Sequence, residues 1–461
     1  MQKIPPATLL ESEEYSITGG IKIIDRWFRT TLDYSNPAAG EIAIFARNAQ
    51  PNKKGNGDCG AGLPYILYLQ GGPGFECGPP ENHPLTNFLF DKGYQVLYLD
   101  QRGTGMSTPI SARMLEDNGG RKRSVEEQAK FVKLFRADNI VRDCEAVRLA
   151  LLGRKEKEED RKWGVVGQSF GGFCAVTYLS IHSEGLREVF TTGGMPPLVN
   201  NPDEVYKPLW QKVKQRNQVY YQKYPLDVER VRDILIHLSK EDVRVPNGGR
   251  LTSRRFLGLG LAFGGHGGID SVHHIVQRAH TDLNVLGHLS YKVLQSIEGN
   301  QSFDGNILYA LVHEPIYCQH HSANWSALRT KPDDKEFYWK QSLDCDNKDQ
   351  PIYFTGEMIF PWAFEDYGEL TKLKGVAEVL AKDAEWPSLY NEDVLAENEV
   401  PVYAATYMED MYVDYTHARR TAGKIRGAKE FVSNTLMHNA VRAKTEAVMG
   451  ELWRLRSGEV D

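Results

Sequence analysis

The stretch KWGVVGQSFGGF, residues 162–173, decides the fold of this chain. Its first half is a β-rich run and a helical pattern follows, so Ser169 lies where a strand turns into a helix. Gly167 and Gly171 flank the serine in a G-x-S-x-G pattern, because such a turn is too tight for side chains there. A chance glycine-serine turn is the alternative, but the flanking strand and helix favour a nucleophile elbow. We therefore predict that Ser169 is a nucleophile at the N-terminal end of a helix.

Strand and helix patterns alternate on both sides of this stretch. Residues 20–34 and 40–49 are typical of an antiparallel pair of strands. Further strands are expected at residues 63–70, 94–100, 186–194, 400–410 and 429–434, and helices at 84–93, 124–152, 172–186, 413–425 and from about 439. This alternation predicts an α/β protein with a mostly parallel sheet and helices on both faces.

The character of the sequence changes after Gly194. Residues 195–399 are mostly amphipathic helical patterns, interrupted by the glycine-rich GLGLAFGGHGG at 258–268 and by an aromatic stretch at 359–368. An insertion of roughly 200 residues has the size of a domain. We therefore expect a sheet domain made of residues 1–194 and 400–461, interrupted by a helical cap of residues 195–399.

A nucleophilic serine needs a base, and two histidines remain after residue 321, His417 and His438. In enzymes with such an elbow, the acid follows the serine and the base follows the acid along the chain. His438 lies just beyond the strand expected at 429–434, and the carboxyl ends of parallel strands are where an open sheet gathers its active site. His417 falls within a predicted helix beside Arg419 and Arg420, which is typical of a surface residue. We predict that His438 is the base.

Three carboxylates at the end of the strand expected at 400–410 compete to orient that base: Glu409, Asp410 and Asp414. Asp410 is the first aspartate after VPVYAAT, residues 400–406 of this strand, where a short loop would aim it at His438. Asp414 suits the N-cap of the helix that begins nearby. We favour Asp410 as the acid, and Asp414 and Glu409 remain alternatives.

The segment QGGPGF, residues 70–75, is a glycine-rich loop after an early strand. Acyl transfer places negative charge on the former carbonyl oxygen, and backbone amides must be waiting for it. In elbow enzymes one amide comes from the residue after the nucleophile, here Phe170, and the other from such a loop. We predict Gly72 as the second donor. The loop has neither the G-K-[ST] nor the G-x-G-x-x-G spacing that binding of a phosphate or a dinucleotide requires.

Composition excludes several other classes of protein. The 55 basic and 61 acidic residues leave a net charge of −6, which argues against nucleic acid as a partner. No apolar run is long enough to cross a membrane, and the N-terminus lacks the apolar core of a signal peptide. The six cysteines form no C-x-x-C pair, and the histidines at 273–280 and 320–321 have no metal-ligand spacing. We expect no metal, no cofactor and a reduced, cytoplasmic setting; the oligomeric state stays open.

Several motifs, in order across most of the chain, resemble those of the prolyl aminopeptidases (proline iminopeptidases) of the α/β-hydrolase fold, in particular the larger fungal and actinobacterial kind. These motifs are QGGPGF, YLDQRGTGMS, GVVGQSFGG, LYALVHEPIYCQ, GEMIFPWAFEDY, YMEDMYVDY and MHNA. The family usually carries His where this chain has Gln70. Catalysis should tolerate the difference because the oxyanion donor is a backbone amide, but we expect the anchoring of the loop to differ.

The resemblance implies a triad of Ser169, Asp410 and His438, and the release of an N-terminal residue, preferably proline, from peptides with a free N-terminus. Such an enzyme must bind a protonated amine, and acidic side chains of the cap are its natural partners. By similarity Glu314 is the first candidate for this anchor, followed by Glu357 or Glu365. Aromatic residues of the cap would shape a pyrrolidine pocket; these are Phe360, Trp362 and Phe364.

Two rival functions remain open at this point. An esterase, amidase or other peptidase could use the same scaffold, since a fold does not determine a substrate. A binding protein could keep the shell without turnover, but such a protein need not retain the serine, the acid, the base and the glycine-rich loop together. The prediction is a serine aminopeptidase that works through an acyl-enzyme.

Overall fold

The computed structural model describes residues 3–18, 20–52, 60, 62–344 and 347–460, which we call the described residues. Nine strands form one sheet in the order β1-β2-β3-β5-β4-β8-β9-β10-β11. The strands are β1 (Thr8–Ile17), β2 (Ile21–Thr31), β3 (Glu41–Pro51), β4 (Tyr65–Leu69), β5 (Gln95–Leu99), β8 (Trp163–Gln168), β9 (Leu186–Thr192), β10 (Val402–Tyr407) and β11 (Ala428–Ser433). The first three are antiparallel, β3 pairs antiparallel with β5, and the strands from β5 to β11 are parallel. The predicted, mostly parallel sheet is confirmed.

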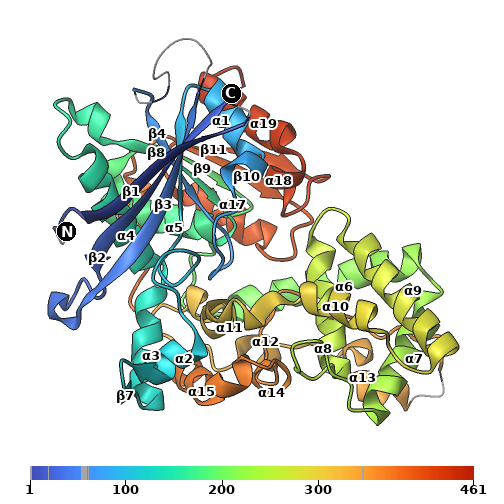
Figure 1. Cartoon of the computed structure of the whole chain (residues 1–461). Coiled ribbons are helices and arrows are strands. Elements are labelled where there is room, and N and C mark those ends of the chain that lie inside the picture. The colour runs from blue at the N-terminus through green and yellow to red at the C-terminus, as the bar shows by residue number, and fades with distance from the viewer. Residues whose placement is uncertain (1–2, 19, 53–59, 61, 345–346, 461) are drawn as a thin grey trace.

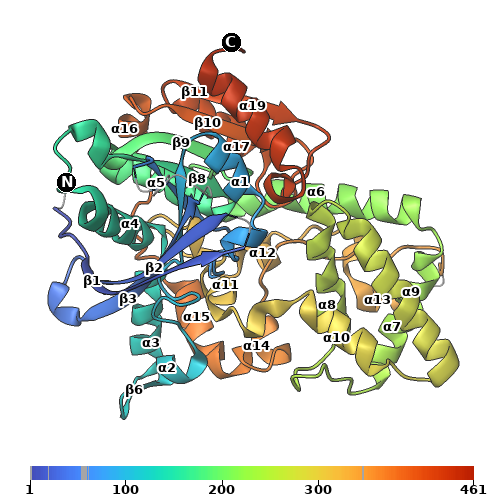
Figure 2. The same ribbon diagram turned by 45° about the horizontal axis from the view of Figure 1, so that its top comes forward.

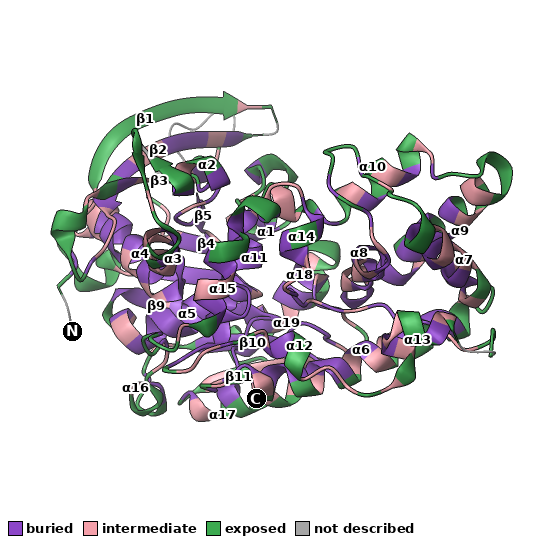
Figure 3. Ribbon diagram, turned by 90° about the horizontal axis from the view of Figure 1, so that it is seen from below, coloured by how far each residue is buried: buried purple, intermediate pink, exposed green. Residues whose placement is uncertain are grey.

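The edge strand β1 is a feature that the sequence pattern did not predict. Nine of its ten residues are exposed, and it pairs only with β2 at the edge of the sheet (Figure 3). Because neither face of this strand is buried, its sequence TLLESEEYSI shows no alternation of apolar and polar residues. The usual signal for a half-buried strand is therefore missing.

Helices cover both faces of the sheet, and the central strands show why. In β4, Ile66 and Tyr68 pack into one apolar cluster, while Leu67 and Leu69 pack into another on the opposite face. One face is covered by α1 (Leu85–Asp91), α18 (Ala440–Ala443) and α19 (Thr445–Ser457), and the other by α4 (Ala137–Leu152), α5 (Phe170–His182) and α17 (Tyr415–Lys424). Strands buried on both faces explain the continuous apolar runs in the sequence.

The single helix expected at 124–152 is wrong, because the chain turns at Arg136. Helix α3 (Val125–Val132) ends before it and α4 begins after it, and Arg136 itself has an extended backbone. Helix α3 packs with α15 (Lys374–Lys382) in one apolar cluster, whereas α4 packs on the sheet in another. One straight helix could not serve both clusters. The buried Arg136 side chain donates hydrogen bonds to the carbonyls of Cys318 and Pro387, both at 2.8 Å, and so stabilises the turn.

The described residues between β9 and β10 form helices and connecting loops, so the large helical part expected from the sequence is present (Figures 1 and 2). Its remaining helices are α6 (Asp203–Lys223), α7 (Asp227–Lys240), α8 (Ser253–Leu257), α9 (Gly268–Leu286), α10 (Tyr291–Gly299), α11 (Ile307–Val312), α12 (Ser326–Arg329), α13 (Trp339–Leu343), α14 (Ala363–Asp366) and α16 (Glu392–Ala396). The domain boundaries at 194/195 and 399/400 stay a prediction. Residues 110–135, which include α2 (Ala112–Glu116), pack with the helical part rather than with the sheet.

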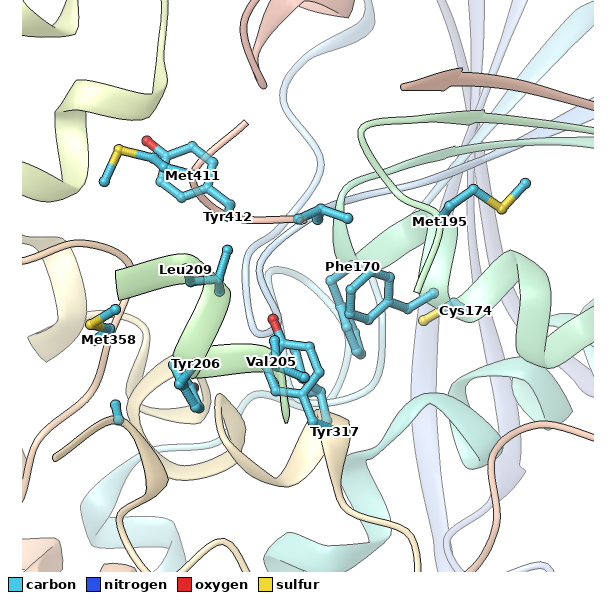
Figure 4. Close-up of a cluster of buried hydrophobic side chains, with 14 of the residues drawn as sticks. Phe170, Cys174, Met195, Val205, Tyr206, Leu209, Tyr317, Met358, Met411 and Tyr412 are labelled. Atoms are coloured by element: carbon cyan, nitrogen blue, oxygen red, sulfur yellow. The ribbon is translucent and has the colours of Figure 1, made fainter. Parts of the chain in front are cut away.

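One apolar cluster runs from the sheet into the helical part. It contains Phe170 and Met195 next to the nucleophile turn, Tyr206 and Tyr317 from the helical part, and Met411 from the loop after β10 (Figure 4). Interiors packed at this density transmit position from one element to the next. The helical part is therefore held in a defined place over the carboxyl ends of the strands.

The turn YLDQRGTGMS after β5 supports the glycine-rich loop. Arg102 is 1% exposed and its guanidinium binds the Asp143 carboxylate at 2.7 Å and the Leu134 carbonyl at 2.8 Å. Its neighbour Gln101 donates a hydrogen bond to the carbonyl of Gln70 at 2.9 Å. The turn therefore has a structural role, with Arg102 bonded to a carboxylate and to backbone carbonyls.

Candidate active site

Ser169 lies in the tight turn between β8 and α5 that the G-x-S-x-G pattern predicts. Its backbone has φ 54° and ψ −125°, a conformation that non-glycine residues seldom adopt. A Cβ atom at Gly171 would lie 2.0 Å from the carbonyl oxygen of Leu69, and one at Gly167 would lie 2.5 Å from that of Gly171. Only glycine fits at these two positions. The packing that forces Ser169 into its strained turn therefore needs both glycines.

His438 and Asp410 meet beside this turn. His438 Nδ1 lies 2.7 Å from Asp410 Oδ2, and both residues are buried. The other carboxylate oxygen of Asp410 accepts hydrogen bonds from the amides of Tyr412 at 2.8 Å and Val413 at 3.0 Å. Because Asp410 occupies Nδ1, the Nε2 atom of His438 is left for a second partner. Gly193 makes room for this pair, since a Cβ there would lie 3.1 Å from His438 Nδ1.

The other residues considered as the base or as the acid that orients it bind other partners. Asp414 caps α17 by accepting a hydrogen bond from the amide of His417 at 2.9 Å. Glu409 forms an ion pair with Lys212 of α6 at 3.3 Å. His417 contacts the carbonyl of Glu204 through its Nε2 atom at 3.1 Å. Of the three carboxylates, the described structure brings only Asp410 to His438.

The glycine-rich interruption in the helical part holds the His438 loop. The amide of His438 donates to the carbonyl of Gly264 at 3.3 Å, and the amide of Met437 donates to His266 Nε2 at 3.1 Å. The Tyr412 ring packs edge-on against the His438 ring with centroids 4.5 Å apart. A Cβ at Gly264 would lie 2.3 Å from that tyrosine ring. The sequence showed these glycines only as a break between helices; the structure shows that they allow the close approach.

The loop QGGPGF lies directly against the nucleophile. A Cβ at Gly71 would lie 3.0 Å from Ser169 Cβ, and Gly72 has φ 135°, which favours glycine. Phe170 is the first residue of α5, where a backbone amide has no acceptor within its own helix. Within the described part of the chain, the amides of Gly72 and Phe170 donate to no other backbone group. Both amides are thus available to a developing oxyanion.

A cavity of about 260 Å³ collects these groups. Ser169, Gly72 and His438 line it from the sheet side, and Glu357 lines it from the helical side. Among the lining residues that sequence reasoning missed are Tyr309 and Arg442. Both lie within or close to motifs that were recognised, LYALVHEPIYCQ and MHNA, but nothing in a linear sequence shows that they face the same space.

Glu357 presents its carboxylate to this cavity. Tyr309 donates a hydrogen bond to Oε1 at 2.9 Å, and Oε2 has no partner among the described residues. The residue is half-buried, which leaves its free oxygen accessible from the cavity. Burial raises the pKa of the Glu357 carboxyl to about 7, although the nearby His438 opposes the shift. A cation that pairs with this carboxylate would stabilise its charged form, which burial disfavours.

Glu314 and Glu365 lie outside the lining of this cavity. Both carboxylate oxygens of Glu314 accept hydrogen bonds from the start of α12, from the amides of Ser326 at 3.1 Å and Ala327 at 2.8 Å. Burial raises the pKa of Glu314 to about 7, and the two bound amides oppose that shift. Glu365 is exposed and pairs with Arg254 and Lys374 on the surface.

Two of the three aromatic residues predicted to shape a proline pocket, Phe360 and Trp362, lie next to the cavity. Phe360 and Trp362 stack with ring centroids 5.4 Å apart, and both line a small cavity of about 20 Å³. This second cavity shares Phe303 and Tyr309 with the larger one. Phe364 lines neither of the two; it packs in the apolar cluster around α14 and α15.

His438 is tuned by the charges around it. Burial lowers its pKa, but the charge and the hydrogen bond of Asp410, together with the charge of Glu357, raise it, so that the pKa lies above its ordinary value. Arg442 acts in the opposite direction. The imidazole is therefore a stronger base than a free histidine, held between one anionic and one cationic side chain of the cavity.

The histidines at 273–280 take part in the packing of the helical part. His273 stacks on Tyr224 and contacts Asp227, and His280 contacts Asp233. Among the described residues, no group of three or more His, Cys, Asp or Glu side chains is placed to hold a metal ion. Cys77, Cys144, Cys174 and Cys318 are free, and Cys59 and Cys345 lie outside the described residues. No helix in the described ranges is long and apolar enough to span a membrane.

These features define a class of protein. The family of the alpha/beta hydrolase fold matches residues 64–255, which contain β4, β5, the nucleophile turn and the start of the helical part. The sheet order, the turn at Ser169 and the family match make the chain an α/β-hydrolase. The fold class predicted from the sequence is confirmed.

Relatives narrow the class to one family. The proline iminopeptidase aneH of Aspergillus aculeatus is 42% identical over 465 residues, which cover 100% of this chain and 99% of that protein. The proline iminopeptidase of Aeromonas sobria is 35% identical over 447 residues, which cover 97% of this chain and 99% of that protein. The chain belongs to the proline iminopeptidase family, as the sequence motifs predicted.

A solved structure, that of the proline iminopeptidase of Mycobacterium smegmatis, aligns over 97% of this chain and 98% of that chain, with a TM-score of 0.42 and 13% identity.

Proposed function

We propose that this protein is a serine aminopeptidase that releases an N-terminal residue, preferably proline, from peptides. One observation carries the proposal: Ser169, His438 and the carboxylate of Glu357 line a single cavity. A residue whose carbonyl lies at Ser169 can therefore place its own amine at Glu357. The full-length similarity to proline iminopeptidases supports proline as that residue.

The proposed chemistry runs in two steps. Nε2 of His438 takes the hydroxyl proton of Ser169 while Oγ attacks the carbonyl carbon of the N-terminal residue. The amides of Gly72 and Phe170 stabilise the oxyanion, and His438 then gives the proton to the leaving amine. Water, activated by the same histidine, attacks the acyl-enzyme and releases the free amino acid. Asp410 holds the imidazole in orientation through Nδ1 and stabilises its charged form.

The proposed amine anchor is Glu357, in preference to Glu314 and Glu365. Glu357 faces the cavity with one free oxygen, whereas both oxygens of Glu314 already accept amide hydrogen bonds. An anion at this place limits cleavage to the first residue, because only the first residue carries a protonated amine. Phe360 and Trp362, beside the cavity, would complete an apolar pocket for the pyrrolidine ring.

The proposal is tested with a panel of aminoacyl arylamides and simple acyl esters, assayed with the wild type and with Ser169→Ala. We expect hydrolysis of the proline arylamide that disappears in Ser169→Ala. A clear preference for simple esters would make the protein an esterase on the same fold. Binding without turnover of any substrate would make it a non-catalytic binding protein.

A second comparison tests the anchor. The wild type is assayed on proline arylamide and on its N-acetyl derivative, which carries no positive charge. We expect the free amine to react far faster, and equal rates for the two substrates would refute an acidic anchor.

A further inference from the structure

Arg442 is a cation in the cavity wall that the proposed reaction does not use. It lies in α18, four residues after His438, and lines the same cavity as Ser169 and Glu357. Its guanidinium is held by two of its nitrogens. Nε donates to Gln168 Oε1 at 2.9 Å, and Nη2 donates to the Tyr68 hydroxyl at 3.2 Å and to the Gln70 side-chain oxygen. These acceptors are buried, so the guanidinium has a defined orientation.

The partners of Arg442 orient it without neutralising it. All three are neutral groups, and within the described residues Arg442 forms no ion pair with a carboxylate. Buried Arg102, by contrast, is neutralised by Asp143 at 2.7 Å. The Nη1 atom of Arg442 makes no hydrogen bond in the described part of the chain, and it carries two N–H groups. Arg442 is an exposed residue, and an oriented cation that has free donors in a cavity wall and no carboxylate partner is suited to an anionic ligand.

Glu357 and Arg442 give the wall of the cavity one acidic and one basic side chain. His438 responds to both, since Glu357 raises its pKa and Arg442 lowers it. A short peptide carries the matching charges, an ammonium at its first residue and a carboxylate at its last. The cavity of about 260 Å³ is smaller than the ~300–1,000 Å³ that drug-sized ligands occupy, so what it encloses must be small.

We propose that Arg442 binds the C-terminal carboxylate of a short peptide, so that the enzyme prefers dipeptides with a free C-terminus to the same peptides with a blocked one. This inference rests on the proposed function, because the ammonium of the peptide occupies the Glu357 side and its first carbonyl lies at Ser169. The carboxylate of the second residue then meets Nη1 of Arg442. Gln70 takes part through its side-chain oxygen, which helps to hold the guanidinium in place.

The test compares prolyl-glycine with prolyl-glycinamide, two substrates that differ in the terminal carboxylate. The measured quantity is the ratio of kcat/KM for the acid to kcat/KM for the amide, in the wild type and in Arg442→Met. A hydrogen bond between charged groups is worth about ten- to hundredfold, so we expect the ratio to fall by about tenfold or more in Arg442→Met. A smaller change would overturn the proposal. The ratio is taken within one enzyme preparation, so it does not depend on the active fraction or on any general loss of activity.

Two further variants make the result specific. Arg442→Lys keeps the charge but loses the bonded fork, and we expect it to retain part of the preference for the acid. Lys444→Met removes an exposed cation two residues away that does not line the cavity, and its ratio should equal that of the wild type. A fall of the same size in Lys444→Met would mean that net charge, and not Arg442, sets the preference.

Hydrolysis of proline arylamide tests the proposed function separately from the role of Arg442. This substrate has no carboxylate, so its hydrolysis by the wild type tests the proposed function alone. If the wild type does not cleave it, the proposed function fails. If the wild type cleaves it but the ratio for the dipeptide pair is unaffected by Arg442→Met, only the role of Arg442 fails.

Discussion

The two sides of the cavity are built in different ways. On the sheet side, each catalytic candidate lies close to the end of a strand. Ser169 directly follows β8, Asp410 follows β10 within five residues, and His438 follows β11 within five residues. On the helical side, Glu357 comes from an irregular segment, and its neighbour in the cavity, Tyr309, comes from α11. The sheet side takes its geometry from short loops on a rigid frame, whereas the helical side depends on how distant segments pack together.

Glu314 and Glu357 show how packing on the helical side determines what a buried carboxylate can bind. Both are in the helical part, and burial raises the pKa of each to about 7. One carboxylate is saturated by the amides of α12, and the other keeps an oxygen free towards the cavity. A shifted pKa therefore does not identify the functional group; the hydrogen-bond partners do.

The largest effect is expected on the sheet side, from Asp410→Asn. The amide would no longer hold the imidazole in its working tautomer, and kcat for proline arylamide should fall by about 10³–10⁴-fold. The matched control is Asp414→Asn, which touches only the cap of α17 and should leave kcat within about twofold. A kcat for Asp410→Asn within tenfold of the wild type would contradict the proposed triad.

The next largest effect is expected on the helical side, from Glu357→Gln. Loss of the half-buried anion that pairs with the substrate ammonium should lower kcat/KM for proline arylamide by about 100-fold. The gap between free and N-acetylated substrates should narrow in this variant. Glu365→Gln is the control, and because its ion pairs are on the surface it should change kcat/KM less than about twofold. Equal losses of kcat/KM in the two variants would show that the carboxylate in the cavity matters no more than the one on the surface.

The pH dependence of kcat/KM should depend on both sides of the cavity. The pKa of Glu357 is about 7 and that of His438 lies above its ordinary value, so both groups are protonated in acid. Raising the pH creates the anionic anchor and the neutral base, and kcat/KM should therefore rise by tenfold or more per pH unit below about pH 7.

The variant Glu357→Gln tests which groups produce this pH profile. The variant loses one ionisation, and without the Glu357 charge the pKa of His438 should fall. The acid limb of kcat/KM should become less steep and move to lower pH. Measurement of kcat/KM from about pH 5 to 9 in both proteins decides the matter; a limb that keeps its position and slope in the variant would show that Glu357 does not act on His438.

The smallest effect on activity is expected from Glu314→Gln. The amides of Ser326 and Ala327 would face a group with only one acceptor, so the free energy of unfolding should drop by about 1–3 kcal/mol. We expect kcat/KM to stay within about threefold of the wild type. Denaturant unfolding and the arylamide assay measure the two quantities. A hundredfold loss of kcat/KM in a folded Glu314→Gln protein would reverse the roles given to the two glutamates.

Much of the sheet side could be predicted from the sequence. The elbow around Ser169 and the strand ends before Asp410 and His438 are local features, because strand, turn and helix patterns are set by neighbouring residues. The roles assigned to these residues remain proposals, but the structure brings Asp410 and His438 together at 2.7 Å. One local prediction failed, and one strand was not predicted, both for a non-local reason. The chain breaks at Arg136 because two different apolar clusters take up its flanking helices, and β1 carries no pattern because nothing covers it.

Contiguous motifs in the sequence specify the family, the α/β order of elements and the residues at the strand ends. Which glutamate faces the cavity depends instead on the packing of segments that are distant in the sequence. Tertiary packing also brings Gly264 to the His438 loop and binds Arg442 to Gln70 and Gln168. These contacts join residues up to 372 positions apart. Their geometry follows from how whole elements pack, and no local pattern of residues specifies it.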